Sequence, residues 1–395
     1  MAKEKKKSGP TLSVNNLAQI REGTVEFGDF TLVVGGQASG KSIFLQLLKL
    51  LIDRRQIFDM MELHALNWSG QFKRMLDLYF GESMSGIWHE ETKVKLDKTS
   101  YGPEILQSRK GTRESTKEEK MFYVPAQRVV TMAQGWPRPF SSFELGDPYV
   151  IKSFSETLRV LMEKESANGQ GDKGVVFPKS GRIHKSIRDQ IDGSIFHGGS
   201  IEIDTSSLRK RFLLHIGESN LPFMTWSAGQ KEFMPLLLSL YHLIVPAKVS
   251  TRDKIEWVVI EEPEMGLHPR AIQTVMLLCL ELISRGYKVA MSTHSPVLLE
   301  LVWAIHNIKE AKGSPDALYE LFSLKKAAFP GDLFKKAIEE KVFKTYYFQR
   351  QADGVYIKDI STLDAGSADP AISNWGGLIE FAGRAAEVVS KLPEK

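Results

Sequence analysis

Residues 30–42 read FTLVVGGQASGKS. Its first five residues are apolar and mostly β-branched, which predicts a buried strand. Gly35 and Gly36 then let the backbone turn with little steric cost. Residues 43–55 carry apolar side chains at a helical spacing, so we expect a helix directly after the loop. The stretch therefore predicts a strand, a tight loop and a helix of an α/β fold.

The loop fits the phosphate-binding pattern G-x-x-x-x-G-K-[ST]. Its backbone N–H groups are expected to cradle the β-phosphate of ATP. We expect Lys41 to reach the β- and γ-phosphates, as a catalytic group as well, and the Ser42 hydroxyl to hold Mg²⁺. The alternative is a glycine-rich turn that binds no nucleotide. The candidate nucleotide contacts are Gly35, Gly36, Gln37, Ala38, Ser39, Gly40, Lys41 and Ser42.

Two acidic residues, Glu261 and Glu262, follow a second apolar strand predicted over residues 257–260. This places them at the carboxyl edge of a parallel sheet, where α/β folds bind ligands. Adjacent strand residues point to opposite faces, so we assign Glu261 to the water shell of Mg²⁺ and Glu262 to the attacking water. Most phosphate-loop enzymes use Asp at the first position, so Glu261 is a departure. The alternative is a solvated acidic turn before Pro263.

His294 follows the next predicted strand, over residues 288–293. At the end of that strand its imidazole can hydrogen-bond the γ-phosphate or hold the attacking water. The alternative is a histidine with a structural role. We therefore treat Glu262, His294 and Lys41 as the candidate catalytic residues.

Residues 226–232 read WSAGQKE, and residues 227–230 resemble the signature of ABC ATPases. In that superfamily two ATPase heads dimerise head-to-tail. The resemblance implies that Ser227, Gly229 and Gln230 contact the γ-phosphate bound by another copy, so that ATP joins the copies and hydrolysis loosens them. A helix beginning after Gly229 would point its positive end at the same phosphate. The alternative is that Ser227 is only a helix N-cap.

Three short sequence strings indicate which branch of the ABC ATPases this chain resembles. Lys231 and Glu232 resemble SMC-like heads, and residues 262–269, EPEMGLHP, are similar to a string of the OLD-like ATPases. Residues 121–128, MFYVPAQR, look like a strand and turn of the same proteins. They make Gln127 a candidate for sensing Mg²⁺ and Arg128 one for a phosphate or interface contact. The alternative for Arg128 is a salt-bridged arginine at a sheet end.

Within the OLD-like branch, the chain resembles the ATPase subunits of PARIS anti-phage systems. The resemblance implies an α/β fold, namely an ABC-type P-loop ATPase head with a mixed or parallel sheet, flanking helices, an antiparallel β subdomain and a helical insert. It implies a regulated ATPase that uses ATP and Mg²⁺ and forms homo-oligomers through head-to-tail ATP-sandwich dimers. A separate nuclease-like effector of the TOPRIM type, released when a phage-encoded trigger is sensed, is the expected partner, because we recognise no TOPRIM-type acidic cluster after His294. The alternatives are a DNA-maintenance ATPase that binds DNA ends, a scaffold that hardly hydrolyses ATP, and the nucleotide-binding domain of a transporter.

The chain is expected to divide into four parts. Inserts on a rigid scaffold carry variable function, so the helical insert is the candidate for partner recognition. The expected parts are a disordered basic tail over 1–10, an N-terminal ATPase lobe over 11–148, a helical insert over 149–193 and a C-terminal lobe over 194–395. Inside the last lobe we expect strands at 195–196, 200–203 and 212–216, a hairpin at 342–360 that turns at Asp353-Gly354, and a helix at 376–392.

Composition argues against several classes of protein. The net charge is +4; residues 1–10 hold four lysines and one glutamate, which is +3, so the rest carries only +1 and a DNA partner is left uncertain. No apolar stretch is long enough to span a membrane, and no apolar signal segment follows the first lysines. The single cysteine, Cys279, lies in an apolar run and is expected to be buried. A cytoplasmic protein without a membrane partner is the expectation.

Overall fold

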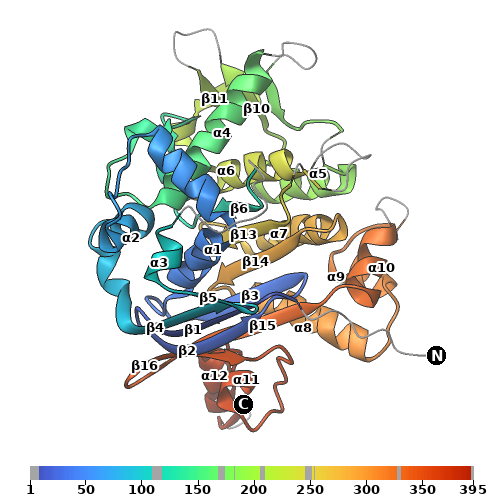
Figure 1. Cartoon of the computed structure of the whole chain (residues 1–395). Coiled ribbons are helices and arrows are strands. Elements are labelled where there is room, and N and C mark those ends of the chain that lie inside the picture. Colours follow the sequence, from blue (N-terminus) through green and yellow to red (C-terminus); the bar gives the residue numbers. More distant parts are fainter. Residues whose placement is uncertain are drawn as a thin grey trace, which may run out of the picture.

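The computed structural model describes residues 9–108, 118–167, 174–181, 183–204, 210–244, 251–252, 254–326 and 331–392. Residues 1–8 of the predicted basic tail lie outside this part of the chain. Figure 1 shows a large sheet through the middle of the molecule, with helices on both sides and a smaller sheet beyond them.

The large sheet has ten strands in the order β5-β4-β1-β2-β16-β15-β3-β14-β13-β6. At one end β15, β3, β14, β13 and β6 run parallel to one another. At the other end β2, β1, β4 and β5 pair antiparallel. The sheet is therefore mixed, as expected. Its strands are β1 (Thr11–Leu17), β2 (Ile20–Glu26), β3 (Phe30–Gly35), β4 (Trp88–Leu96), β5 (Thr99–Tyr101), β6 (Met121–Val124), β13 (Trp257–Glu261), β14 (Lys288–Thr293), β15 (Phe343–Gln351) and β16 (Gly354–Asp359).

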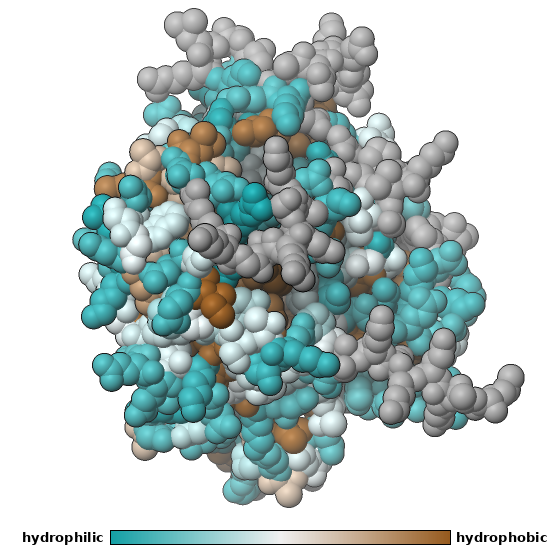
Figure 2. Space-filling model, viewed as in Figure 1, coloured by the Kyte–Doolittle hydropathy of each residue, from teal (hydrophilic) through white to brown (hydrophobic). Residues whose placement is uncertain are grey.

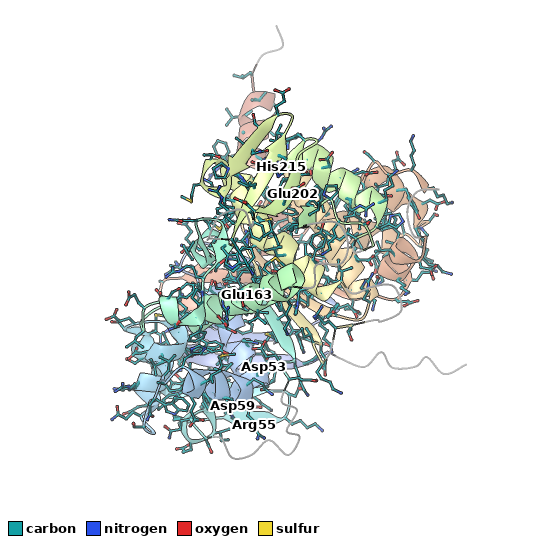
Figure 3. The ribbon with its side chains drawn as sticks, turned by 90° about the horizontal axis from the view of Figure 1, so that it is seen from above. Asp53, Arg55, Asp59, Glu163, Glu202 and His215 are labelled. Atoms are coloured by element: carbon teal, nitrogen blue, oxygen red, sulfur yellow. The ribbon has the colours of Figure 1, made fainter. Side chains whose placement is uncertain are left out.

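An antiparallel sheet of four strands, in the order β12-β11-β10-β9, forms the predicted β subdomain. Glu202 and His215 lie on its two middle strands (Figure 3), with 3.4 Å between Oε2 and Nε2. A two-stranded ribbon, β7–β8, completes the strands. The bounds are β9 (Val175–Phe177), β10 (Ser200–Asp204), β11 (Arg211–Ile216), β12 (Ser219–Pro222), β7 (Met132–Ala133) and β8 (Trp136–Pro137).

The helices cover both faces of the large sheet because its central strands are buried on both sides. On β13, Val258 and Ile260 pack into one hydrophobic cluster, while Trp257 and Val259 pack into another. The first cluster includes residues of α6, α7, α8 and α10, and the second includes residues of α1 and α2. The helices are α1 (Lys41–Leu63), α2 (Phe72–Phe80), α3 (Pro103–Leu106), α4 (Tyr149–Ala167), α5 (Lys185–Ile191), α6 (Ala228–Leu243), α7 (Pro269–Ser284), α8 (Pro296–Glu310), α9 (Asp316–Leu321), α10 (Gly331–Glu339), α11 (Pro370–Ser373) and α12 (Glu380–Ser390).

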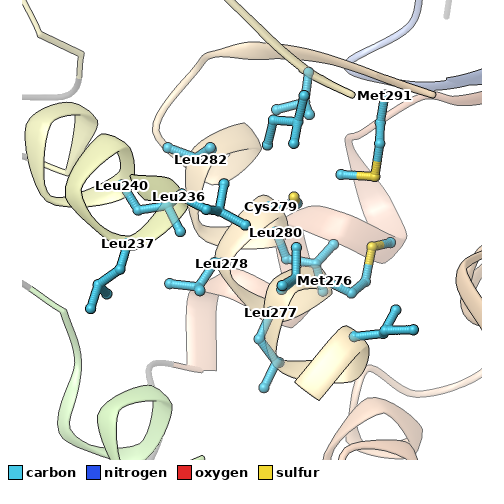
Figure 4. Close-up of a cluster of buried hydrophobic side chains, with 14 of the residues drawn as sticks. Leu236, Leu237, Leu240, Met276, Leu277, Leu278, Cys279, Leu280, Leu282 and Met291 are labelled. Atoms are coloured by element: carbon cyan, nitrogen blue, oxygen red, sulfur yellow. The ribbon is translucent and has the colours of Figure 1, made fainter. Parts of the chain in front are cut away.

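The packing of α6 against α7 forms much of the first cluster (Figure 4). Leu236 and Leu240 of α6 lie near Leu280 and Leu282 of α7, and Met291 of β14 lies nearby. Cys279 is buried in this region, as predicted, and burial raises the pKa of its thiol to about 12. This packing fixes the helix that carries the signature relative to the strands that carry the acidic residues.

Helix α1 is interrupted at Asp53, where φ is −114° and ψ is 24°. The Asp53 carboxylate accepts hydrogen bonds from the backbone N–H groups of Lys120 and Met121, at 2.8 and 3.0 Å, and from Lys49 at 2.7 Å. Figure 3 marks its place in the helix, above Asp59. Asp53, which forms a buried ion pair with Lys49, thus ties the helix after the phosphate loop to the start of β6.

The structure differs from the expected elements in four places. Residues 195–196, expected as a strand, belong to a π-helix over Asp192–Phe196. A run of two apolar residues carries no periodicity, and Phe196 buries its ring against Phe177, with 4.8 Å between ring centroids, without entering a sheet. The expected boundary at 193 falls between β9 and β10, which pair with each other, so the segment 149–193 is joined to the strands after it. The turn of the C-terminal hairpin lies between Gln351 and Gly354, and α12 is shorter than predicted.

No helix in the described part of the chain is both long and apolar enough to cross a membrane.

Candidate nucleotide-binding and catalytic site

The phosphate loop lies between β3 and α1, as the sequence predicts. Gly35 has a φ of 151°, and a Cβ there would lie 2.8 Å from the carbonyl oxygen of Phe348, so only glycine fits without displacement. Gly40 has a φ of 94° and caps the N-terminus of α1. Gly36 has open space around it. The exposed part of the loop, residues 36–38, therefore presents backbone to solvent where a phosphate can approach.

Hydrogen bonds hold the outer side of the phosphate loop against neighbouring parts of the large sheet. The carbonyl oxygen of Ala38 accepts hydrogen bonds from Gln19 Nε2 at 2.8 Å and from Arg350 Nη2 at 2.5 Å. Arg350 lies on β15, which pairs with β3. The shape of the loop therefore depends on a strand more than 300 positions further along the chain.

Lys41 is buried, and its ammonium group is held inside the loop. Its Nζ donates to the carbonyl oxygens of Gly35 and Gly36, both at 2.9 Å. Burial lowers the pKa of Lys41, and the nearby carboxylates of Glu262 and Glu261 act in the opposite direction. The ammonium group is thus placed where it can exchange loop carbonyls for phosphate oxygens.

Glu261 ends β13 with its side chain buried. Burial raises the pKa of its carboxyl group, and the Ser42 hydroxyl next to it opposes the rise. Its Oε1 atom has no hydrogen-bond partner among the described residues. A buried carboxylate oxygen without a partner is costly, and a cation beside Ser42 would satisfy it. The pair Ser42 and Glu261 therefore fits a Mg²⁺ ion held through its water shell.

The metal would depend on the nucleotide for most of its ligands. Within the described residues, no cluster of three or more His, Cys, Asp or Glu side chains could hold a metal ion. Mg²⁺ is commonly bound by one or two protein groups together with substrate phosphates. This chain offers that kind of site.

Glu262 and His294 come together at the ends of β13 and β14. The distance from His294 Nε2 to Glu262 Oε1 is 3.3 Å, and both side chains are partly exposed. Glu262 has a φ of 41°, the left-handed region that non-glycine residues seldom adopt. Its N–H donates to the carbonyl oxygen of Ser292 at 2.9 Å, which holds this unusual backbone in place. Strained residues of this kind cluster at functional sites.

Glu264 is a site residue to which the sequence analysis gave no role. Its Oε1 accepts hydrogen bonds from the Thr293 hydroxyl at 2.8 Å and from the His294 N–H at 2.5 Å. Glu264 therefore fixes the backbone that carries His294. The second acidic residue of the string EPE was the available signal. Its spacing alone does not distinguish a carboxylate that holds the backbone at His294 from a carboxylate that is only solvated.

The rest of the string 262–269 builds the turn into α7. Gly266 has a φ of 69°, and its backbone packs against Gly229, where a Cβ would lie 2.5 Å from the Gly266 carbonyl oxygen. His268 is the N-cap of α7, accepting from the Arg270 N–H through Nδ1, and Pro269 occupies the first turn. The signature and the acidic loop are thus in direct backbone contact.

Ser227 is the N-cap of α6, and with Gln230 it forms a capping box. Its hydroxyl accepts from the Gln230 N–H at 3.3 Å, and Gln230 Oε1 accepts from the Ser227 N–H at 3.1 Å. Gln230 Nε2 also donates to the carbonyl oxygen of Ile195 at 3.1 Å. α6 begins at Ala228, two residues earlier than expected. The structure shows the capping role; a contact of Ser227, Gly229 and Gln230 with a second copy's nucleotide stays a prediction.

Arg128 corrects one prediction, because it is fully buried and cannot reach a phosphate or an interface. Its guanidinium group donates to backbone carbonyl oxygens at 2.9 to 3.2 Å and lies 3.6 Å from the Glu232 carboxylate. Burial lowers its pKa, and Glu232 opposes this. The accepting residues are Pro125, Glu232, Glu261 and Glu262. Arg128 thus joins β6, β13 and α6, which is the alternative of a salt-bridged arginine at the sheet end.

Gln127 lies just before this arginine, and its side chain is exposed. The backbone of its neighbour Ala126 hydrogen-bonds the Glu261 carboxylate. The loop therefore reaches the acidic edge of the sheet, and a contact of Gln127 with Mg²⁺ stays a prediction.

Solved structures that are similar to this chain have low sequence identity to it, and their TM-scores are below 0.5. The SMC head domain from Thermotoga maritima has 12% identity and a TM-score of 0.37, with 89% of this chain and 98% of that chain covered. An SMC head bound to the C-winged helix domain of ScpA has 12% identity and a TM-score of 0.40, with 88% and 96% covered. A dimeric bacterial ABC transporter cassette has 11% identity and a TM-score of 0.32, with 72% and 88% covered. No curated protein matches the chain.

A family model covers part of the chain. Residues 129–300 match the AAA domain whose description names the AbiEii toxin and type IV TA systems. This range holds the signature, the acidic strand end and His294, while the phosphate loop precedes it. The chain thus has a mixed sheet with flanking helices and a phosphate loop between β3 and α1, and its middle part is similar to this AAA domain.

Proposed function

We propose that this protein binds and hydrolyses ATP with Mg²⁺ and uses the cycle as a molecular switch. The observation that carries the proposal is the convergence of five side chains at one edge of the parallel strands. Glu261, Glu262 and His294 lie on two neighbouring strands or directly after them, Lys41 begins the helix that follows the adjacent strand β3, and Ser42 lies next to Glu261.

In hydrolysis, a water oxygen forms a bond to the γ-phosphorus while the bond from that phosphorus to the β–γ bridging oxygen breaks. Glu262 is placed to accept a proton from the water, and His294, at 3.3 Å from it, to orient the water or the γ-phosphate. Lys41 stabilises the charge on the phosphate oxygens. Mg²⁺, held by Ser42 and through water by Glu261, would neutralise charge on the β- and γ-phosphates.

We infer that two copies assemble head-to-tail around ATP. The N-terminus of α6, with Ser227, Gly229 and Gln230, would face the γ-phosphate bound by the other copy. The backbone contact between Gly229 and Gly266 supports this, because it links that surface to the loop that carries Glu262. A change at the γ-phosphate could then alter the contact between copies.

The cellular role we propose is control of a separate effector in an anti-phage complex, with a TOPRIM-type nuclease as the effector and a phage-encoded trigger. Two observations support it: the similarity of residues 262–269 to OLD-like ATPases, and the match to a family whose description names the AbiEii toxin. A DNA-maintenance ATPase is the second candidate, and the small net charge of +4 counts against it.

The test is affinity purification of Glu262→Gln from the native host, with ATP and without nucleotide, followed by mass spectrometry. We expect a nuclease-like protein to be retained only with ATP. The matched control is Glu256→Gln, which removes an exposed carboxylate at the other end of β13. A homo-oligomer that retains DNA and no protein would reject the effector role in favour of DNA maintenance.

A further inference from the structure

The C-terminal helix α12 has an apolar side that nothing in the described part of the chain covers. None of its residues is buried. Phe381 is 77% exposed, Val388 63% and Val389 65%, and Leu392 just after the helix is 63% exposed. With about 3.6 residues per turn these side chains, together with Ala385, fall on one side of the helix. In Figure 2, hydrophobic surface interrupts the hydrophilic surface at the lower end of the molecule, where Figure 1 places α12.

The residues that precede α12 are packed against the rest of the protein. Trp375, before α12, donates from Nε1 to the carbonyl oxygen of Leu363 at 2.8 Å, and its ring lies 6.1 Å from that of Trp303. Gly376 packs against Tyr347 and Val34 of the large sheet. An anchored helix with an exposed apolar side is a candidate interaction surface.

The charged residues of α12 all lie on one flank of the apolar side. They alternate in sign along the helix and form two ion pairs within it, at 2.9 Å and 2.5 Å. The opposite flank carries Ala382 and Ala386 instead. The four charged residues are Glu380, Arg384, Glu387 and Lys391.

We propose that α12 pairs antiparallel with the α12 of a second copy. A twofold axis between Ala385 and Ala386 would place Glu380 opposite Lys391, and Arg384 opposite Glu387, each on the other copy. In an antiparallel pair the same flanks of the two helices meet, so every charge faces its opposite. In a parallel pair the charged flank would face the alanine flank. The pattern of signs therefore fits a second copy of this chain in one orientation.

Side-chain sizes agree with the same register. It places Val389 opposite Ala382 of the second copy, so a large residue meets a small one. Alanines at the axis let the two helices approach closely. A pair of such short helices buries less than the ~1,200 Å² of a standard interface, so the contact is weak alone and adds to other contacts between copies. It needs no nucleotide, which separates it from the ATP-dependent dimer.

Cysteine crosslinking tests the pairing in the full-length chain. Ala385→Cys places a thiol at the axis, and Ser390→Cys places one on the far side of the same helix. The native Cys279 is buried, and burial raises its pKa to about 12, so it stays unreactive. Under mild oxidation without nucleotide, we expect a covalent dimer from Ala385→Cys and little from Ser390→Cys. Equal crosslinking of the two variants, or none from Ala385→Cys, overturns the proposal and leaves this side of α12 to another kind of partner.

A charge exchange tests the orientation. In the Ala385→Cys background, Arg384→Glu turns two attractive contacts between copies into repulsive ones. We expect association roughly tenfold weaker, as for a few exposed ion pairs, and recovery in Arg384→Glu/Glu387→Arg. Both variants put the same new carboxylate next to Glu380 within one helix, so recovery reports the contact between copies. Loss without recovery, in variants whose circular dichroism is unchanged, overturns the antiparallel register.

Discussion

Glu262 is the residue on which hydrolysis is expected to depend. Glu262→Gln keeps the size of the side chain and removes the base, so ATP hydrolysis should fall about 100-fold or more while nucleotide affinity is kept. Phosphate release and equilibrium nucleotide binding measure the two quantities. Glu256→Gln serves as the control and should change neither. Unchanged hydrolysis in Glu262→Gln would reject the catalytic assignment.

Arg128 is expected to matter for stability before it matters for activity. Arg128→Met leaves buried carbonyl oxygens of β6, β13 and α6 without donors, which should lower the free energy of unfolding by about 3 kcal/mol or more. Chemical denaturation of the variant and of Arg55→Met, at an exposed position of α1, gives the comparison. Full stability with lost nucleotide binding would restore the phosphate-contact hypothesis.

At the scale of elements, the contact between the start of α6 and the loop after β13 leaves no room for a side chain. Gly229→Ala puts a Cβ 2.5 Å from the Gly266 carbonyl oxygen, so one backbone must move. We expect a loss of roughly 1–3 kcal/mol in stability, together with reduced ATPase activity. Gly193→Ala is the matched control, because nothing lies within 4 Å of the added atom. Similar behaviour of the two variants would show that the contact tolerates displacement.

The Glu156 carboxylate of helix α4 should contribute to the loss of stability at low pH. Glu156 accepts the Phe140 N–H at 2.9 Å, and its hydrogen bond to Arg159 is the main cause that lowers its pKa. A carboxyl group with a lowered folded-state pKa stabilises the fold above its unfolded pKa, about 4.3, and this stability is lost as pH falls through the folded value. The midpoint temperature of thermal unfolding, measured between about pH 7 and pH 3, should fall more steeply with decreasing pH for the wild type than for Glu156→Gln. Parallel profiles would contradict the assignment.

At the scale of the whole molecule, the head-to-tail dimer can be tested separately from helix capping. Ser227→Asp keeps a good N-cap but sets a carboxylate against the γ-phosphate of the other copy. In the Glu262→Gln background, ATP should produce dimers that the added Ser227→Asp removes, while Ser227→Thr retains them. Sedimentation velocity with and without ATP measures this. Dimers that survive Ser227→Asp would place the signature outside the interface.

The sequence predicted the parts of the fold that local patterns encode. The strand before Gly35, the strand before Glu261 and the strand before His294 all lie where expected, because buried parallel strands are short apolar runs that end in distinctive residues. The mixed sheet and the antiparallel subdomain are confirmed as well.

What the sequence did not reveal depends on contacts between distant positions. Arg128 carries the same charge whether it faces a phosphate or four carbonyls, and only the packing of α6 above it decides. Glu264 and Asp53 accept hydrogen bonds from groups 29 or more positions away, namely the Thr293 hydroxyl and the backbone N–H groups of His294, Lys120 and Met121. Such partners leave no periodic trace in the chain.

The place of β3 in the sheet has a consequence for how the protein is made. β3 pairs with β14 on one side and β15 on the other, so its neighbours are synthesised about 250 and 310 residues after it. While the chain emerges from the ribosome, the phosphate loop has neither flanking strand nor Arg350 to hold it. The nucleotide site can therefore form only after β14 and β15 have been synthesised, and a chain stopped before them would lack a working ATP site. Synthesis of β15 thus precedes any switching.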